Sequence, residues 1–224
     1  MRSVILKPLL RCTGCKLPPR WCICPAAEII HTPLQIDLLS HPRELNRPSS
    51  TGNLIKRVIK GARQIVWNQT ASHDTQLTAI AGRELLILHP DGKPLPKRTD
   101  LSAIQFLLLD GYWNEARGMS NDLSTRGDFV SLPMHGPSRY WLRGKQEEER
   151  YSTAETVVFL LQALGLPEAS DKLQVQFELH VYAGLRARGR KDLAGQYLEH
   201  SVLRTALPDF INQLNSRRPR RLGD

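Results

Sequence analysis

Short apolar runs alternate along the chain with segments in which apolar residues recur at helical spacing. Four runs have the length and continuity of strands covered on both faces, at 34–39, 84–90, 104–109 and 128–133. Helical spacing is found at 54–66, 157–164 and 171–188. Strands that alternate with helices predict an α/β fold, with a mostly parallel sheet and helices on both of its faces.

The run at 104–109 ends abruptly in Asp110-Gly111, and a helix-compatible segment containing Glu115 follows. A carboxylate at the carboxyl end of a buried strand, at a glycine turn into a helix, is where open α/β sheets place ligands. A plain strand-to-helix turn with Asp110 as a cap fits the same spacing. The pattern therefore makes Asp110 the first candidate for a site residue.

The segment 47–52, Arg-Pro-Ser-Ser-Thr-Gly, is rich in signals for the start of a helix. Free backbone N–H groups at such a start suit a phosphate or a carboxylate. An ordinary N-cap, followed by a solvated basic face that carries Lys56 and Arg57, explains the segment as well.

All four cysteines fall within thirteen residues, as Cys12, Cys15, Cys22 and Cys24. In a reducing compartment such clustering favours a metal over disulfides. Four thiolates would complete a tetrahedral zinc site with no open position, so we expect the zinc to be structural. Free thiols or a redox pair are the alternatives.

The chain has an excess of basic residues, because 31 Lys and Arg against 22 Asp and Glu give a formal charge of +9 over 224 residues. This balance favours a polyanionic partner, nucleic acid before membrane. The first ten residues lack a signal-peptide pattern, and no run approaches transmembrane length. We therefore expect a cytoplasmic protein that does not bind membranes.

Four segments in order carry a resemblance to a known family: the Cys-x2-Cys…Cys-x-Cys opening, 47–52, Asp110-Gly111-Tyr112-Trp113, and Ser152-Thr153-Ala154-Glu155. Together they resemble the DTW-domain family, whose characterised members are tRNA-uridine aminocarboxypropyltransferases. The segment 138–143 resembles a further family segment. Two residues depart from the family pattern: Tyr112 stands where threonine is expected, and Ser50 where asparagine is usual.

The resemblance implies a fold related to the knotted, SPOUT-like methyltransferases, with S-adenosylmethionine (SAM) as co-substrate in loops at the strand ends. The implied reaction moves the 3-amino-3-carboxypropyl group of SAM to N3 of a uridine in tRNA and releases methylthioadenosine. The expected organisation is a zinc-binding module at 1–30, a catalytic domain at 31–205 and a basic tail at 206–224. The sequence does not indicate the oligomeric state.

The resemblance also implies roles for individual residues. Asp110 and Trp113 are the expected catalytic residues. The expected SAM-binding residues are Ser49, Thr51, Gly52, His89, Pro90, Leu109, Gly111, Tyr112, Leu132 and Glu155. Candidates for contacts with tRNA phosphates are Lys56, Arg57, Arg139 and Arg143.

Several roles stay open at the level of sequence. Asp110 either accepts the uridine N3 proton as a general base or organises its loop. Trp113 either packs on SAM, stacks on uracil or belongs to the core. Glu155 either contacts the amino group of SAM or caps its own helix. A SAM-dependent RNA methyltransferase and a non-catalytic, zinc-containing RNA-binding protein are the competing functions.

Overall fold

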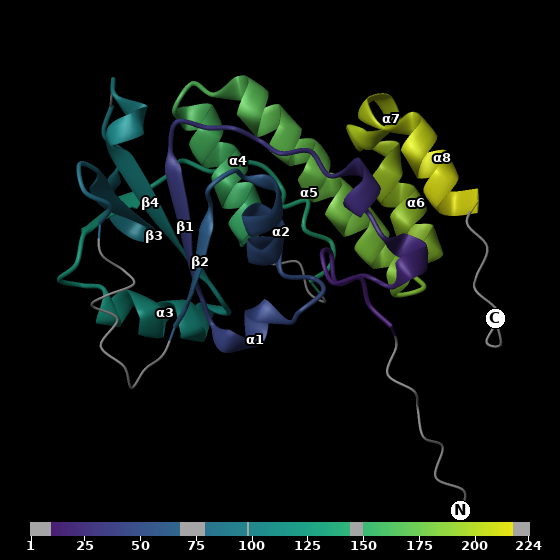
Figure 1. Ribbon diagram of the computed structural model, residues 1–224, viewed down its shortest axis with the longest axis horizontal. Coiled ribbons are helices and arrows are strands. Elements are labelled where there is room, and N and C mark those ends of the chain that lie inside the picture. Colours follow the sequence, from purple (N-terminus) through teal and green to yellow (C-terminus); the bar gives the residue numbers. More distant parts are fainter. Residues whose placement is uncertain (1–9, 68–78, 98, 144–149, 217–224) are drawn as a thin grey trace, which may run out of the picture.

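The computed structural model describes residues 10–67, 79–97, 99–143 and 150–216. Its centre is one five-stranded sheet in the order β2-β1-β4-β3-β5, in which every neighbouring pair is parallel (Figure 1). The strands are β1 (Gln35–Ser40), β2 (Arg63–Val66), β3 (Glu84–Pro94), β4 (Ile104–Asp110) and β5 (Asp128–Ser131). The expected parallel sheet is confirmed, and four of its strands arise from the four apolar runs.

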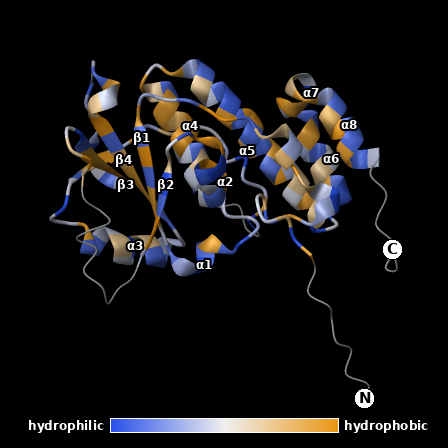
Figure 2. Ribbon diagram, in the orientation of Figure 1, coloured by the Kyte–Doolittle hydropathy of each residue, from blue (hydrophilic) through white to orange (hydrophobic). Residues whose placement is uncertain are grey.

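Helices cover both faces of this sheet, as the sequence predicts. On one face, α3 (Trp113–Asp122) buries Met119 against Leu39, Ile87 and Leu107. The opposite face carries the larger core, built from α2 (Thr51–Val58), α4 (Thr153–Ala163) and α5 (Pro167–Ala187). The inner strands of the sheet and helix α4 carry long hydrophobic stretches, whereas the first half of the edge strand β2 is hydrophilic, so the core lies between the inner strands and α4 (Figure 2).

The helix expected to continue to residue 66 is shorter than its apolar spacing predicts. Helix α2 ends at Val58, and Gly61 follows with φ of +81°, a left-handed conformation that favours glycine. The chain then extends as β2 and pairs with β1, where Nε of Arg63 donates a 2.9 Å hydrogen bond to the buried carboxylate of Asp37. Because Ile65 and Val66 also fit helical spacing, the sequence pattern alone did not reveal this strand.

Within the described residues, three further helices follow α5 and pack at the end of the molecule remote from the sheet (Figure 1). They are α6 (Lys191–Glu199), α7 (Leu203–Ala206) and α8 (Pro208–Ser216). The expected tail at 206–224 therefore begins with a helix whose Ile211 and Leu214 are buried. Its clustered arginines, at 217–221, lie outside the described residues.

The N-terminal segment carries two short 3₁₀ turns, η1 (Pro19–Trp21) and η2 (Cys24–Ala26). Leu17, Trp21 and Ile23 are buried in the same hydrophobic cluster as the large core. The guanidinium groups of Arg20 and Arg186 lie 4.8 and 4.7 Å from the centre of the Trp21 ring. No helix within the described ranges is long and apolar enough to cross a membrane.

Candidate functional site

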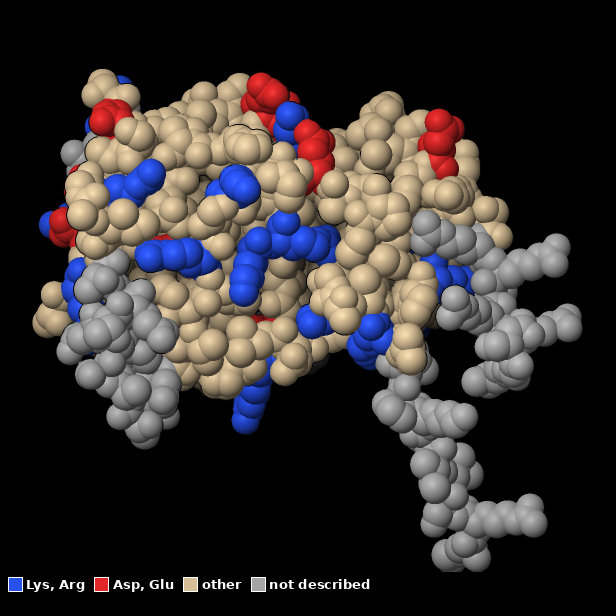
Figure 3. All heavy atoms as spheres, in the orientation of Figure 1, with Lys and Arg blue, Asp and Glu red and all other residues tan. Residues whose placement is uncertain are grey.

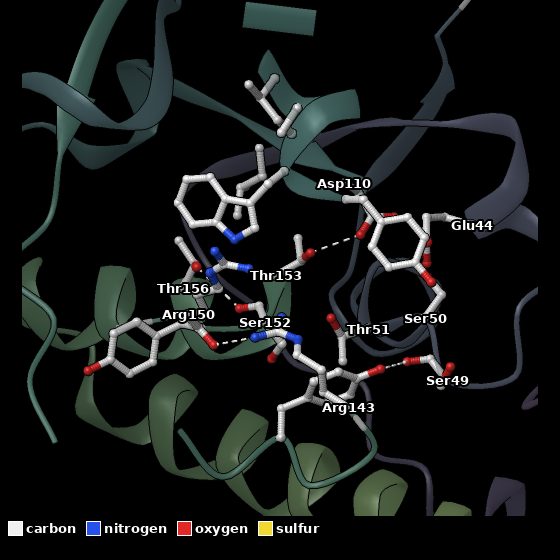
Figure 4. Close-up of a pocket in the computed structure, with 18 of the residues that line it drawn as sticks. Glu44, Ser49, Ser50, Thr51, Asp110, Arg143, Arg150, Ser152, Thr153 and Thr156 are labelled. Atoms are coloured by element: carbon white, nitrogen blue, oxygen red, sulfur yellow. Dashed lines mark hydrogen bonds between the residues drawn. The ribbon is translucent and has the colours of Figure 1, made fainter. Parts of the chain in front are cut away.

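A cavity of about 1190 Å³ opens where the carboxyl ends of β3, β4 and β5 meet the starts of α2 and α4. The strands contribute Leu88, Asp110 and Val130 to its wall, and the helix starts contribute Thr51 and Thr153. In open α/β sheets this edge is the usual place for a ligand. Figure 4 shows the polar side chains of these segments converging on the same space.

Two helix N-termini point at this cavity, and side chains cap both. Ser50 accepts a 3.3 Å hydrogen bond from the backbone N–H of Asn53 at the start of α2, and Ser152 accepts one of 3.3 Å from Glu155 N–H at the start of α4. The hydroxyl of Thr51 accepts a hydrogen bond from Ala154 N–H at 3.3 Å, which ties the two helix starts together. The positive ends of two helix dipoles therefore favour an anionic group in the cavity.

Asp110 joins the end of β4 to the end of β1 and to the start of α4. Its carboxylate is only 3% exposed, and it accepts hydrogen bonds from Thr153 at 2.8 Å and Ser40 at 3.0 Å. A Cβ placed on Gly52 would come within 2.1 Å of Oδ2, so α2 begins directly against this carboxylate. Burial raises the pKa of Asp110, while the two hydroxyl donors oppose that rise.

Two large aromatic side chains stand at the mouth of the cavity, at the start of α3. Tyr112 is 58% exposed and Trp113 is 51% exposed. The guanidinium group of Arg47 lies 4.5 Å from the centre of the Tyr112 ring, and that of Arg150 lies 5.4 Å from the Trp113 ring. Trp113 is therefore not a core residue, and the mouth carries two exposed rings, each with an arginine side chain beside it.

A second carboxylate, which the sequence pattern did not single out, lies beside Asp110. Glu44 belongs to α1 (Pro42–Leu45), lines the cavity, is 6% exposed and forms an ion pair with Arg47. Burial raises the pKa of the Glu44 carboxyl to about 7, with a further contribution from the negative charge of Asp110. Glu44 and Asp110 lie on the same side of the cavity, opposite Arg150 (Figure 4).

The four cysteines form one compact cluster. Their sulfur atoms all lie within 4.8 Å of one another, with Sγ of Cys12 at 3.6 Å from Cys24 and Sγ of Cys15 at 3.8 Å from Cys22. A hydrogen bond from the backbone N–H of Cys15 contributes most to lowering the pKa of the Cys12 thiol to about 6, whereas burial raises that of Cys24 to about 12. Four soft donors at this spacing can hold one metal ion such as zinc.

A family model described as the DTW domain matches residues 9–183. The chain belongs to the DTW-domain family. The match includes the cysteine cluster and all of the cavity lining except Gly184, Ala187 and Arg188, and membership is consistent with a tRNA-modifying role. No solved structure was found to match the chain.

Within this DTW domain, the structure brings most of the expected site residues to the cavity. Its wall includes Asp110, Trp113, Ser49, Thr51, His89, Pro90, Leu109, Gly111, Tyr112, Leu132 and Arg143. Gly52 lies behind this wall, where its lack of a side chain makes room for Asp110.

Other expected residues have structural partners away from the cavity. Glu155 caps α4 by accepting from Ser152 N–H at 2.7 Å, and it also accepts from the backbone N–H of Arg139 at 2.6 Å. The Arg139 side chain donates to the carbonyl of Tyr197 at 3.1 Å. Neither residue lines the cavity. The geometry thus supports the capping role for Glu155.

The two basic candidates on α2 also lie outside the cavity wall. Lys56 is exposed, whereas Nε and Nη2 of Arg57 are buried without a hydrogen-bond partner among the described residues. Arg143 does line the cavity, and there it donates to the carbonyl of Arg150 at 2.7 Å. Of the four basic candidates, Arg143 alone is part of the cavity wall in the described structure.

Proposed function

We propose that this DTW-domain protein transfers the 3-amino-3-carboxypropyl group of SAM to N3 of a uridine in tRNA and releases methylthioadenosine. The observation that carries the proposal is the convergence of the family segments on one cavity. The segments that contain Thr51, Asp110 and Thr153 are far apart in sequence, yet all three side chains line the same wall. Family membership is consistent with a tRNA-modifying reaction in that cavity and so supports the proposal.

The size of the cavity suits two reactants. Cofactor sites in proteins typically occupy about 300–1,000 Å³, and this cavity measures about 1190 Å³. SAM would occupy the inner part, where the helix starts at Ser50 and Ser152 favour its carboxylate. A nucleobase would enter from the side of Tyr112 and Trp113, on whose exposed rings it can stack.

Charge supports tRNA as the partner. Six arginines line the cavity and its mouth: Arg11, Arg47, Arg117, Arg143, Arg150 and Arg188. Lysine and arginine side chains also spread over the face that carries α2, while most acidic side chains in view lie along its upper edge (Figure 3). Neutralised phosphates would supply much of the affinity, so we expect binding to weaken steeply with salt.

Of the two roles expected for Asp110, its contacts favour the organising role. Both carboxylate oxygens accept hydrogen bonds, from Thr153 and Ser40, and the group is almost wholly buried. Asp110 would therefore hold the helix starts in register around SAM. Trp113 would stack on the uracil or on SAM at the cavity mouth, and the cysteine cluster would hold a structural zinc ion.

Which carbon of SAM faces the nucleophile decides between this transfer and methylation, because the same sulfonium activates all three carbons. The test is to incubate the purified protein with SAM and an unmodified tRNA transcript, and to separate the small-molecule products by chromatography. We expect methylthioadenosine and a tRNA heavier by one aminocarboxypropyl group at a uridine. A reaction without tRNA is the control.

The other outcomes identify the competing functions. S-adenosylhomocysteine as the sole by-product would replace the proposal with a methyltransferase. No consumption of SAM, together with retained tRNA binding, would indicate a non-catalytic RNA-binding protein.

A further inference from the structure

The two acidic side chains on one side of the cavity differ in what their oxygens contact. Both oxygens of Asp110 accept hydrogen bonds from neighbouring hydroxyl groups. In Glu44, Oε1 is paired with Nη1 of Arg47. Among the described residues, Oε2 of Glu44 has no hydrogen-bond partner, and it is not among the polar atoms sealed from solvent. Glu44 therefore has an oxygen available to a ligand in the cavity.

A chain of contacts connects this carboxylate to the mouth. Arg47 pairs with Glu44 and places its guanidinium group 4.5 Å from the centre of the exposed Tyr112 ring. The Arg47 side chain therefore contacts both Glu44 and the Tyr112 ring, on which a nucleobase can stack. A base held at this mouth would have its hydrogen-bonding edge within reach of the residues just inside it.

We propose that Glu44 is a catalytic residue that accepts the N3 proton of the uridine, and that Arg47 is its positioning residue. The inference rests on the proposed aminocarboxypropyl transfer and adds to it the identity of the base. Tyr112, which stands where the family has threonine, covers the outer face of Arg47 and fixes its guanidinium group over Glu44.

The transfer forms one bond, breaks one bond and moves one proton. N3 of the uracil forms a bond to the SAM carbon adjacent to sulfur, and the bond between that carbon and the sulfonium breaks. The electron pair of the broken bond stays on sulfur, which leaves neutral methylthioadenosine. The N3 proton passes to the Glu44 carboxylate and later to solvent.

The charges around Glu44 suit a base near neutral pH. The groups that act on it most are Asp110 from β4, Glu115 from α3 and Arg47 from the loop after α1. Tyr140, from the segment between β5 and α4, also interacts electrostatically with it. Burial and the two carboxylates raise the pKa of Glu44, Arg47 opposes them, and the balance is about 7. A carboxylate with a raised pKa is a stronger proton acceptor, and near pH 7 about half of it is still in the charged form that can accept a proton.

The experiment compares Glu44→Gln with the wild-type protein in the assay that measures methylthioadenosine from SAM and tRNA. Loss of a general base typically lowers the rate by about 10²- to 10⁴-fold. We expect a fall in kcat within this range, with a SAM Kd measured by calorimetry that stays within about threefold. The wild-type rate should rise with pH through about 7, and Glu44→Gln should lack that rise.

Three further variants keep the test sharp if Glu44→Gln folds poorly. Glu44→Asp keeps the carboxylate and should recover part of the rate. Arg47→Gln removes the opposing positive charge, so the rise in rate should move to higher pH, a shift that a merely structural role would not produce. Glu28→Gln, which removes a carboxylate from an ion pair with Lys172 outside the cavity, is the matched control and should behave as wild type.

The outcomes separate the inference from the proposed function. If the wild-type protein produces no methylthioadenosine, the proposed function fails and the inference fails with it. If the wild-type protein is active and folded Glu44→Gln matches its rate, the inference alone is overturned. It is also overturned if the loss in Glu44→Gln lies entirely in a higher SAM Kd, because Glu44 would then bind the cationic co-substrate.

Discussion

The hydroxyl of Thr153 donates a 2.8 Å hydrogen bond to Oδ1 of Asp110 and so joins the first residue of α4 to the last residue of β4. The hydroxyl of Ser40, the last residue of β1, donates a 3.0 Å hydrogen bond to Oδ2 of Asp110. Ser40 and Asp110 also lie opposite each other in the pairing of β1 with β4. The aspartate of the family signature therefore holds the strand ends and the helix start in one arrangement. The wall of the cavity depends on that arrangement.

We expect Thr153→Val to destabilise the fold and to reduce activity together. The valine keeps the shape of threonine but leaves a buried carboxylate oxygen without its donor, at a cost of about 1–3 kcal/mol. Thr153→Ser restores the hydroxyl and is the matched control. Urea denaturation measures the free energy of unfolding, and equal values for valine and serine would show that the hydrogen bond contributes nothing.

Gly52→Ala should displace the Asp110 carboxylate and so reduce both stability and SAM binding. The added Cβ would lie 2.1 Å from Oδ2 of Asp110, so either α2 or the carboxylate must shift. Overpacking of this kind typically costs about 1–3 kcal/mol. Gly195→Ala in α6, where nothing lies within 4 Å of the new Cβ, should instead be neutral or stabilise slightly. Melting temperatures and SAM binding of the two variants give the comparison, and a Gly52→Ala protein with normal binding would contradict it.

The cysteine cluster should hold one zinc ion per chain. Because Leu17 and Trp21 of the same segment are buried in the large core, loss of the ion should lower the melting temperature of the whole protein. Elemental analysis of Cys15→Ser should find the zinc content reduced, whereas Thr13→Ala, an exposed change in the same loop, should retain it. A wild-type protein purified without chelator that contains no metal would refute this prediction.

His180 should make the fold sensitive to acid. It is 3% exposed, its two ring nitrogens lack partners among the described residues, and burial lowers its pKa to about 4, assisted by the charges of Arg57 and Arg188. Between the ordinary pKa of about 6.5 and this value, the unfolded chain binds a proton that the folded protein does not, so stability falls as pH falls. The difference amounts to about 3 kcal/mol at most, from about 1.4 kcal/mol per pKa unit.

The corresponding variant is His180→Leu, which should lose this part of the pH dependence and should resist acid better than the wild-type protein. Glu44, whose folded pKa is raised, acts in the opposite direction, and stability falls as pH rises from about 4.5 to about 7. Thermal melts of the variant and the wild type at pH 5 and pH 8 separate the two effects. Parallel pH profiles would show that His180 does not titrate as expected.

The fold was predictable wherever one short-range pattern was strong. The apolar run that ends at Asp110 predicted β4 because a strand buried on both faces needs little polar alternation. Strand β2 was missed because Ile65 and Val66 also fit the helix before them, and only pairing with β1 decides the matter. Local periodicity carries no information about such pairing.

Some residues of the candidate site were predictable from sequence motifs, and others are recognised only from the structure. The segments around Thr51, Asp110 and Thr153 were predictable because their motifs, taken in order, resemble the DTW-domain family, whose model matches residues 9–183. Glu44 was not found, because a glutamate near a helix start is ordinary and its character comes from burial beside Asp110. The reverse holds for Arg139, which looked suited to phosphate but is bonded to Tyr197 in the structure.

The contacts around Asp110 join residues that are distant in sequence, which bears on how the protein reaches its native state. The bonds from Thr153 and Ser40 span 43 and 70 residues, and the bond from Ala154 N–H to Thr51 spans 103. Contacts of this span close large loops, so they form late and slow the folding of a domain. The cavity would accordingly be absent from partly folded chains and from fragments, and binding of SAM would report the completion of folding.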